Sequence, residues 1–217
     1  QKNYCLPWRT VEDNVRLLIQ VEAIKQEEAR LAVLGCHKLL EPGDRPALIF
    51  DIGGGSTELV MGDEEPREAT SMDIGSVRLT ERHLGDDPPN SAQLAACQAD
   101  IERHLATSGI EIEQAQSIIG TSGTIKTIAC GVLALPGYDR AGFDGQTLRI
   151  DQTLEFCDEL VAMSSQERRA LPYMHPGRAD VIAAGALIWR GILSRASVET
   201  YLVSESDILH AIARSIA

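Results

Sequence analysis

The stretch from Leu48 to Val60 constrains the fold of this chain more than any other part of the sequence. A short apolar run ends at Asp51, three consecutive glycines occupy positions 53–55, and an alternating run of apolar and polar residues begins at Thr57. Apolar runs of this length are typical of buried strands, and consecutive glycines are typical of tight turns. The pattern predicts a strand, a glycine turn and a returning strand, with an acid at the end of the first strand.

The predicted glycine turn has the chemistry of a phosphate site. Without Cβ atoms, successive backbone N–H groups can point into one concavity, which suits phosphate oxygens. Asp51 and Glu58 could hold a hard cation beside the anion, because Mg²⁺ prefers one or two carboxylates together with phosphate and water. A glycine hairpin with an incidental acid on each side is the alternative, and the complete pattern favours the phosphate site.

A second stretch, residues 116–126, repeats this arrangement with a helix in place of the returning strand. Its buried strand leads into a turn of Gly, Ser and Thr residues, so that the exposed N–H groups lie at a helix N-terminus. The hydroxyl groups of Ser122 and Thr124 are further candidate donors. An ordinary strand–helix connection would look similar. Two such turns in one chain favour a site in which both turns contact a single phosphorylated ligand from opposite sides.

Composition limits how such a ligand could be held. The chain has 217 residues, 44% of them hydrophobic, which suits one large domain or one and a fraction. A net charge of −12 provides no basic stripe for a nucleic-acid backbone, so we expect no nucleic-acid partner. An anion must therefore be bound by local N–H groups, a few placed Arg or Lys residues and a metal.

The cysteines and the apolar segments indicate a cytoplasmic protein without a membrane partner. The five cysteines are scattered and lack C-x-x-C spacing, which fits reduced thiols better than disulfides or zinc. No signal peptide is visible, and the longest apolar stretch, residues 181–193, is interrupted by Arg190 and too short to span a bilayer.

The rest of the chain predicts an alternation of helices and strands. Expected helices cover residues 10–40, a segment beginning at Gly75–Ser76, residues 92–105, 151–163 with Asp151 as cap, 165–170, 179–195, and a final helix capped by Ser204. Expected strands cover residues 67–72, 148–150 and 200–203, and residues 133–145 form a loop.

Two arginines are candidates for contact with the anion. Arg78 could reach a phosphate or pair with Glu81 on the helix surface. Arg178 and His175 stand at the entrance of the helix expected over 179–195, where either could face a polyanion, although a capping or surface role is the simpler interpretation.

With these motifs, the segments Glu27–Leu31 and Gly177–Ala186 complete a resemblance to the exopolyphosphatase / guanosine pentaphosphate phosphohydrolase (Ppx/GppA) family of the actin-like ATPase superfamily. The likeness covers residue 26 to the C-terminus, and the motifs occur in the family's order. Glutamates corresponding to Glu28 and Glu58 favour the phosphatase branch. The resemblance and the expected elements imply an α/β fold, a ribonuclease-H-like domain over residues 46–217 with antiparallel first strands, a mixed sheet and helices on both faces. Residues 1–45 would be a helical remnant of the interdomain or first-domain region.

The resemblance also implies a reaction, the hydrolysis of a terminal phosphoanhydride of inorganic polyphosphate or guanosine pentaphosphate to release orthophosphate. Glu28 would orient and deprotonate the attacking water, and Asp51 and Glu58 would hold Mg²⁺. The phosphate-binding residues would be Gly53, Gly54, Gly55, Ser56, Ser122, Gly123 and Thr124. Such a reaction depends mainly on positioning and electrostatics.

One departure from the family pattern concerns its first phosphate loop. Nothing in residues 1–20 resembles it, so we expect either a fragment that carries mainly the second domain or a chain whose N-terminal part has been replaced. In both cases we expect weak or no activity for the chain alone; the full-length parent could form a homodimer. A domain that binds polyphosphate or an alarmone without hydrolysis is the main alternative. An ATP-binding actin-like or sugar-kinase-like protein ranks last, because the longer adenine-pocket sequences are not evident.

Overall fold

The computed structural model describes residues 45–63 and 66–205. Its strands are β1 (Ala47–Ile52), β2 (Thr57–Gly62), β3 (Pro66–Met72), β4 (Ser117–Gly120), β5 (Thr147–Arg149) and β6 (Thr200–Val203). Its α-helices are α2 (Ser76–His83), α3 (Ser91–Ala106), α4 (Gly123–Val132), α5 (Arg140–Phe143), α6 (Ile150–Ala162), α7 (Ser165–Ala170), α8 (Pro176–Ala179) and α9 (Ile182–Leu193). A 3₁₀ turn, η2, covers Ile112–Gln114.

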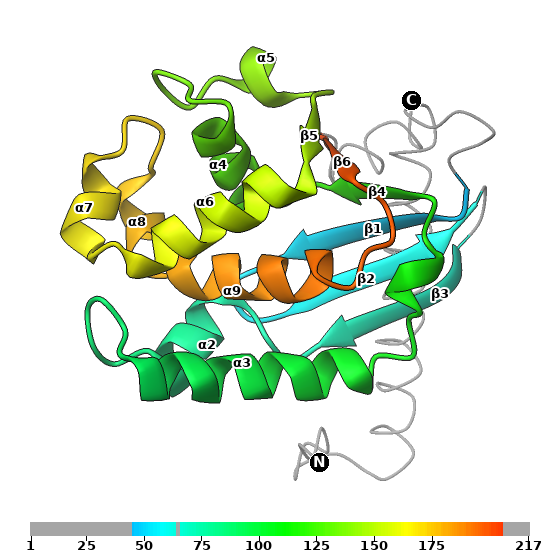
Figure 1. Cartoon of the computed structure of the whole chain (residues 1–217), viewed down its shortest axis with the longest axis horizontal. Helices are drawn as coiled ribbons and strands as arrows, with labels where there is room; N and C mark the ends of the chain where they lie inside the picture. The colour runs from blue at the N-terminus through cyan, green and yellow to red at the C-terminus, as the bar shows by residue number, and fades with distance from the viewer. Residues whose placement is uncertain (1–44, 64–65, 206–217) are drawn as a thin grey trace, which may run out of the picture.

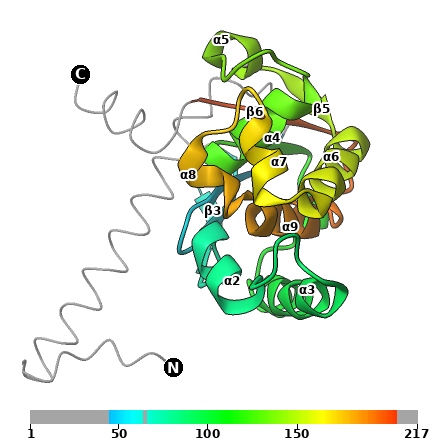
Figure 2. The same ribbon diagram turned by 90° about the vertical axis from the view of Figure 1, so that its left-hand side faces the viewer.

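The six strands form one mixed sheet in the order β3-β2-β1-β4-β6-β5 (Figure 1). Strands β1, β2 and β3 are an antiparallel meander, whereas β4 lies parallel to both β1 and β6. Phe50, Gly120 and Val203 are in register across the three parallel strands. Because parallel strands end at the same edge of a sheet, the segments that follow β1, β4 and β6 come together there, as the predicted pair of turns requires. Figure 2 looks onto this edge.

Helices α2, α3, α4, α6 and α9 cover one face of the sheet (Figures 1 and 2). The alternating residues Leu48, Phe50 and Ile52 of β1 point into the core beneath them, as the period of a strand dictates. The prediction of a mixed sheet with antiparallel first strands is confirmed. Within the described part of the chain the helical layer lies on this one face, and the final helix expected after Ser204 falls outside that part, as do the expected helix over residues 10–40 and the N-terminal segment as a whole.

The centre of the core is an aromatic stack on α9. Trp189 is fully buried, and its ring makes edge-to-face contacts with Phe50 at 4.5 Å and with Tyr201 at 5.0 Å between centroids. Edge-to-face pairs of this kind contribute about 0.5–1.5 kcal/mol each beyond the area that they bury. The stack fixes α9 against β1 and β6, and so determines where the two ends of this helix lie.

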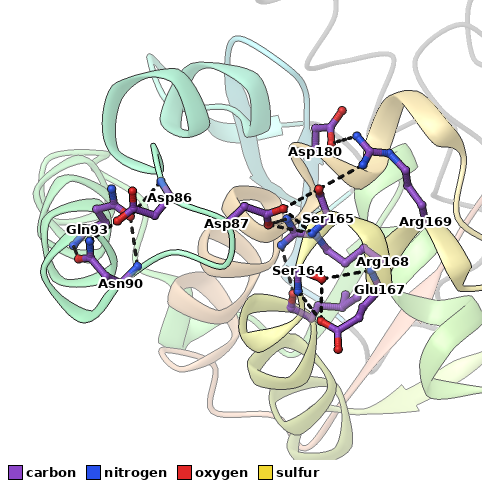
Figure 3. A network of polar contacts seen from close by, with 11 residues as sticks. Asp86, Asp87, Asn90, Gln93, Ser164, Ser165, Glu167, Arg168, Arg169 and Asp180 are labelled. Atoms are coloured by element: carbon purple, nitrogen blue, oxygen red, sulfur yellow. Dashed lines mark hydrogen bonds and ion pairs between the residues drawn. The ribbon is translucent and has the colours of Figure 1, made fainter.

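A polar network fixes α7 against the loop between α2 and α3 (Figure 3). The carboxylate of Asp87 accepts hydrogen bonds from the backbone N–H of Ser165 at 2.8 Å and from its hydroxyl at 2.6 Å, and pairs with buried Arg168. Arg169, on the same helix, pairs with Asp180 at the end of α8. The network therefore links segments more than 70 residues apart and places α8 next to α7.

Several element boundaries differ from the sequence-based expectation. The helix expected over 179–195 is split into α8 and α9, because Asp180 and Val181 do not continue the helical ladder. Asp151 lies in the first turn of α6 and pairs with Arg149, which is the capping residue. Part of the loop expected over 133–145 forms the short helix α5.

The capping residue Asn90 forms a capping box with Gln93 at the start of α3. Cys97, Cys130 and Cys157 are free and buried, in agreement with the expectation of reduced thiols. None of the described helices is long and apolar enough to cross a membrane.

Candidate functional site

The first glycine turn joins β1 to β2 and is tied to the beginning of α2. The N–H of Gly53 donates to the carbonyl of Ser56 at 2.9 Å and closes the turn. The carbonyl of Gly53 accepts from the N–H of Ser76, and that of Gly54 accepts from the N–H of Val77, both at 2.9 Å. In a trans peptide the N–H points away from the C=O, so the N–H groups of Gly54 and Gly55 point away from α2. This turn therefore presents successive amides outward, as an anion site requires.

The close approach of the turn to α2 depends on Gly75. A Cβ atom at this position would lie 2.5 Å from the carbonyl oxygen of Gly54 and 2.7 Å from the carbonyl carbon of Gly55. Both contacts are with backbone, which cannot rotate away as a side chain can. Gly75 is thus the residue that allows the first turn to lie directly on the N-terminal end of α2.

The second turn lies between β4 and α4 and is held against the end of β1. The backbone N–H and the hydroxyl of Thr121 both donate to the carbonyl of Phe50 at 3.2 Å, and the hydroxyl of Thr124 donates to the carbonyl of Ile52 at 3.4 Å. Ser122 caps α4, with its Oγ accepting from the N–H of Ile125 at 3.2 Å. The structure thus brings the two predicted turns together at one edge, although the Thr124 hydroxyl proton is used within the protein.

Asp51 and Glu58 are directly opposite each other on β1 and β2. Residues paired across antiparallel strands project from the same face of a sheet, so the two carboxylates lie together on the face opposite Phe50 and Ile52. Glu58 also accepts a hydrogen bond from the hydroxyl of Ser71 at 2.8 Å. No group of three or more His, Cys, Asp or Glu side chains suited to a metal occurs in residues 45–63 and 66–205. Two carboxylates beside an anion site still fit Mg²⁺, which takes its other ligands from phosphate and water.

Each turn has one of the two candidate arginines beside it. A Cβ atom on Gly55 would lie 3.4 Å from Nη2 of Arg78, and one on Gly123 would lie 2.5 Å from Nη2 of Arg178. Arg78 pairs with Asp73, so the alternative pairing with Glu81 is not the one observed. Arg178 donates to the hydroxyl of Thr127 at 2.7 Å. Both guanidinium groups therefore lie within reach of an anion on the turns.

The remaining predicted residues are less directly placed. Glu28 lies outside the described residues. His175 caps the N-terminus of α8, with its Nδ1 accepting from the N–H of Gly177 at 3.2 Å, which agrees with the capping interpretation. The sequence analysis assigned no role to Lys126, which lies buried one turn into α4. A lysine near a helix N-terminus, where the helix dipole disfavours a cation, was the signal that could have identified it.

The domain is ribonuclease-H-like and of the actin-like ATPase class. This class is defined here by the strand order, the antiparallel meander at the start and the two turns at the carboxyl edge of the parallel strands. Residues 9–208 match the profile of the Ppx/GppA phosphatase family. The chain belongs to this family.

Individual relatives agree with this assignment. Exopolyphosphatase 2 of Mycobacterium tuberculosis is 38% identical over 197 residues, covering 88% of this chain and 62% of the relative. The solved structure of an exopolyphosphatase-like protein superposes with a TM-score of 0.83 at 32% identity, covering 94% of this chain and 73% of the other. The Ppx/GppA phosphatase of Aquifex aeolicus gives 0.80 at 27% identity, covering 94% and 70%. The chain thus spans less than two thirds of the length of the mycobacterial relative.

Proposed function

We propose that this chain binds the end of an inorganic polyphosphate chain and takes part in hydrolysis of its terminal phosphoanhydride, releasing orthophosphate. The observation that carries the proposal is that both turns lie at one edge of the sheet, because Thr121 and Thr124 of the second turn donate to the carbonyls of Phe50 and Ile52 at the end of β1, directly before the first turn. The names of the relatives, exopolyphosphatases, supply the substrate class.

Each turn is assigned one part of the ligand. The amides of residues 53–56 hold the terminal phosphate, and those of residues 122–124 hold the next phosphate, with Arg78 and Arg178 beside them. Backbone amides and two arginines suffice for this in a protein of net charge −12, because they act locally. The ligand is therefore held at its end, and the terminal bond is the one exposed to attack.

Asp51 and Glu58 are the proposed ligands of Mg²⁺. Asp51 and Glu58 would hold the metal beside the first turn, and the chemistry that it would supply there is neutralisation of charge on the phosphoryl oxygens. Because Asp51 and Glu58 are paired on neighbouring strands, their carboxylates lie on the same face of the sheet, beside the first turn. Glu28 is proposed as the general base that orients the attacking water and takes its proton, a role worth about 10²–10⁴-fold in rate.

Binding and turnover test different parts of the proposal. Titration calorimetry of pyrophosphate with Mg²⁺ should show binding that Glu58→Gln weakens by about tenfold or more, since a charged ligand is lost. Asp63→Asn removes the same charge at the far end of the β2–β3 hairpin, where Asp63 pairs with Arg67, and should leave the affinity unchanged. Equal affinity in all three proteins would contradict the metal assignment.

Orthophosphate release separates hydrolysis from binding alone. Glu28→Gln should abolish release from long-chain polyphosphate while leaving the affinity unchanged. If both the wild-type chain and Glu28→Gln bind polyphosphate without releasing orthophosphate, the domain acts as a polyphosphate or alarmone sensor; release that Glu28→Gln leaves unchanged would contradict the role assigned to Glu28. Competition between polyphosphate and guanosine pentaphosphate in the same assay decides which of the two substrates is preferred.

A further inference from the structure

The second turn has a buried cation beside it that the proposed phosphate contacts do not use. Lys126 has a side chain only 7% exposed, and its ammonium lies 3.0 Å from Oε2 of Glu205. The same ammonium donates to the backbone carbonyl of Glu205 at 3.3 Å. Lys126 lies one turn after Ser122 and Gly123 in α4, and helical side chains lean towards the N-terminus of their helix, which is the end where the second turn lies.

Glu205 reaches this position from β6, the third parallel strand. The N–H of Ser204 donates to the carbonyl of Gly120 at 2.9 Å, and the N–H of Glu205 donates to Oδ1 of Asp144 at 2.8 Å. Gly120 and Val203 are in register, so Ser122 and Glu205 each lie two residues beyond the same level of the sheet. The first turn, the second turn and Glu205 therefore follow one another along the edge, because they succeed β1, β4 and β6, which are neighbours in that order in the sheet.

The Lys126–Glu205 pair provides a buried ammonium group with its counterion. A buried ammonium requires a counterion, because removing one partner of a buried pair is strongly destabilising. Phosphate oxygens are acceptors of the same kind as carboxylate oxygens and form similarly short contacts with an ammonium group. A phosphate that arrives at Lys126 would satisfy the ammonium as well as Glu205 does, and the two anions cannot share the site without repulsion.

We propose that Lys126 is a third phosphate subsite and that Glu205 guards it, so that this pair sets the response of the domain to the length of the phosphate chain. The inference rests on the proposed function, in which the two turns hold the first two phosphates. A diphosphate occupies the two turns and leaves the pair intact. A third phosphate gains Lys126 only by replacing the Glu205 carboxylate, so Glu205 reduces the advantage of longer chains.

The ratio of tripolyphosphate affinity to pyrophosphate affinity, measured by calorimetry in Mg²⁺, tests this. Glu205→Gln should raise the ratio by about tenfold, the value of one charge-assisted contact, by strengthening tripolyphosphate binding alone. Lys126→Met should lower the ratio, and Lys126→Arg should keep it. Glu199→Gln removes the same charge from an exposed position at the other end of β6 and should leave the ratio unchanged.

The double variant Lys126→Met/Glu205→Gln distinguishes the subsite from a general field effect. With the ammonium absent, removing Glu205 should no longer raise the ratio; an equal rise in the double variant would overturn the proposal. An unchanged ratio in Glu205→Gln and in Lys126→Met would overturn it too. If the wild-type chain shows no pyrophosphate binding, the proposed function itself is refuted. Urea unfolding of each variant, with Lys126→Gln in place of Lys126→Met where the latter does not fold, keeps the comparison among folded proteins that lack the ammonium group.

Discussion

The glycines of this chain differ in what surrounds them, and the difference determines which can be replaced. At Gly75 an added Cβ meets the backbone of the first turn, whereas at Gly123 it meets the movable end of Arg178. At Gly137 it meets nothing within 4 Å. A methyl group added against a rigid neighbour strains the backbone. Against a flexible neighbour it only displaces a side chain slightly.

Gly75→Ala is expected to destabilise the fold by about 3 kcal/mol, because two backbone groups must move to admit the methyl group. Urea unfolding measures the loss. Gly137→Ala is the matched control, for which we expect a change within about 0.5 kcal/mol. Equal stability of the two variants would contradict the contact between Gly75 and the first turn.

At the scale of elements, single buried charges hold helices together. Asp100 on α3 is 6% exposed and is contacted by Arg82 and His83 of α2 and by Arg103 of its own helix. Burial raises the pKa of the Asp100 carboxyl, but the hydrogen bonds from His83, Arg82 and Arg103 outweigh it and hold the pKa well below its usual range. The α2–α3 contact therefore depends on an ionised carboxylate.

This linkage predicts a pH-dependent stability. A carboxyl whose pKa is lowered by folding stabilises the protein above the unfolded-state pKa of about 3.9, and the stabilisation is lost as the pH falls through the folded-state pKa. Asp100→Asn should lower the free energy of unfolding by about 2 kcal/mol at pH 7, and the difference from wild type should shrink below about pH 4. Urea unfolding between pH 3 and 7 measures both.

Asp151→Asn is the control for this experiment. Asp151 also has a lowered pKa, chiefly through its hydrogen bond with Arg149, but it is fully solvated. Its replacement should leave the stability unchanged within error at each pH. A wild-type advantage over Asp100→Asn that does not vary with pH would show that the α2–α3 contact is not linked to ionisation.

How far the elements follow from the sequence depends on how local their causes are. The hairpin at the first turn and the helix α3 were predicted because each is determined by residues close together in the sequence. The break between α8 and α9 was missed, since the sequence there continues a helical pattern and the break is set by the packing of α8 against α7. The pairing of Lys126 with Glu205, 79 residues away, was beyond local reasoning for the same reason.

The candidate site divides in the same way. The identities of the turn residues were predicted from composition and order, and their meeting at one edge follows from parallel strands. The partners of Arg78 and of the Thr124 hydroxyl were not predicted. They are Asp73 and the carbonyl of Ile52, and their distances depend on how the chain enters α2 and leaves β1.

At the scale of the whole molecule, α9 supports both turns at once. A Cβ atom on Gly185 would lie 2.6 Å from Cγ2 of Thr124, at the second turn, and 3.5 Å from Cβ of Ser76, which holds the first turn. The contact means that one helix sets the height of both turns above the core.

Gly185→Ala should therefore weaken pyrophosphate binding as well as stability, by about tenfold and about 2 kcal/mol respectively. Gly191→Ala in the same helix is the control, because its Cβ would press on Ile101 of α3 at 3.0 Å, away from the turns. It should cost stability and spare the affinity. Calorimetry and urea unfolding of the pair decide the point, and equal affinities would contradict a shared support.

The common support under the two turns has a mechanical consequence. The second turn rests on α9 and hydrogen-bonds to the end of β1, whereas the first turn continues directly from that strand end and is tied to α2, which also rests on α9. The two turns therefore cannot swing apart independently. They are expected to move as one rigid unit. A hinge that admits or releases a ligand is expected elsewhere in the protein. Labels placed on the two turns should accordingly keep a constant separation on ligand addition, whatever other distances change.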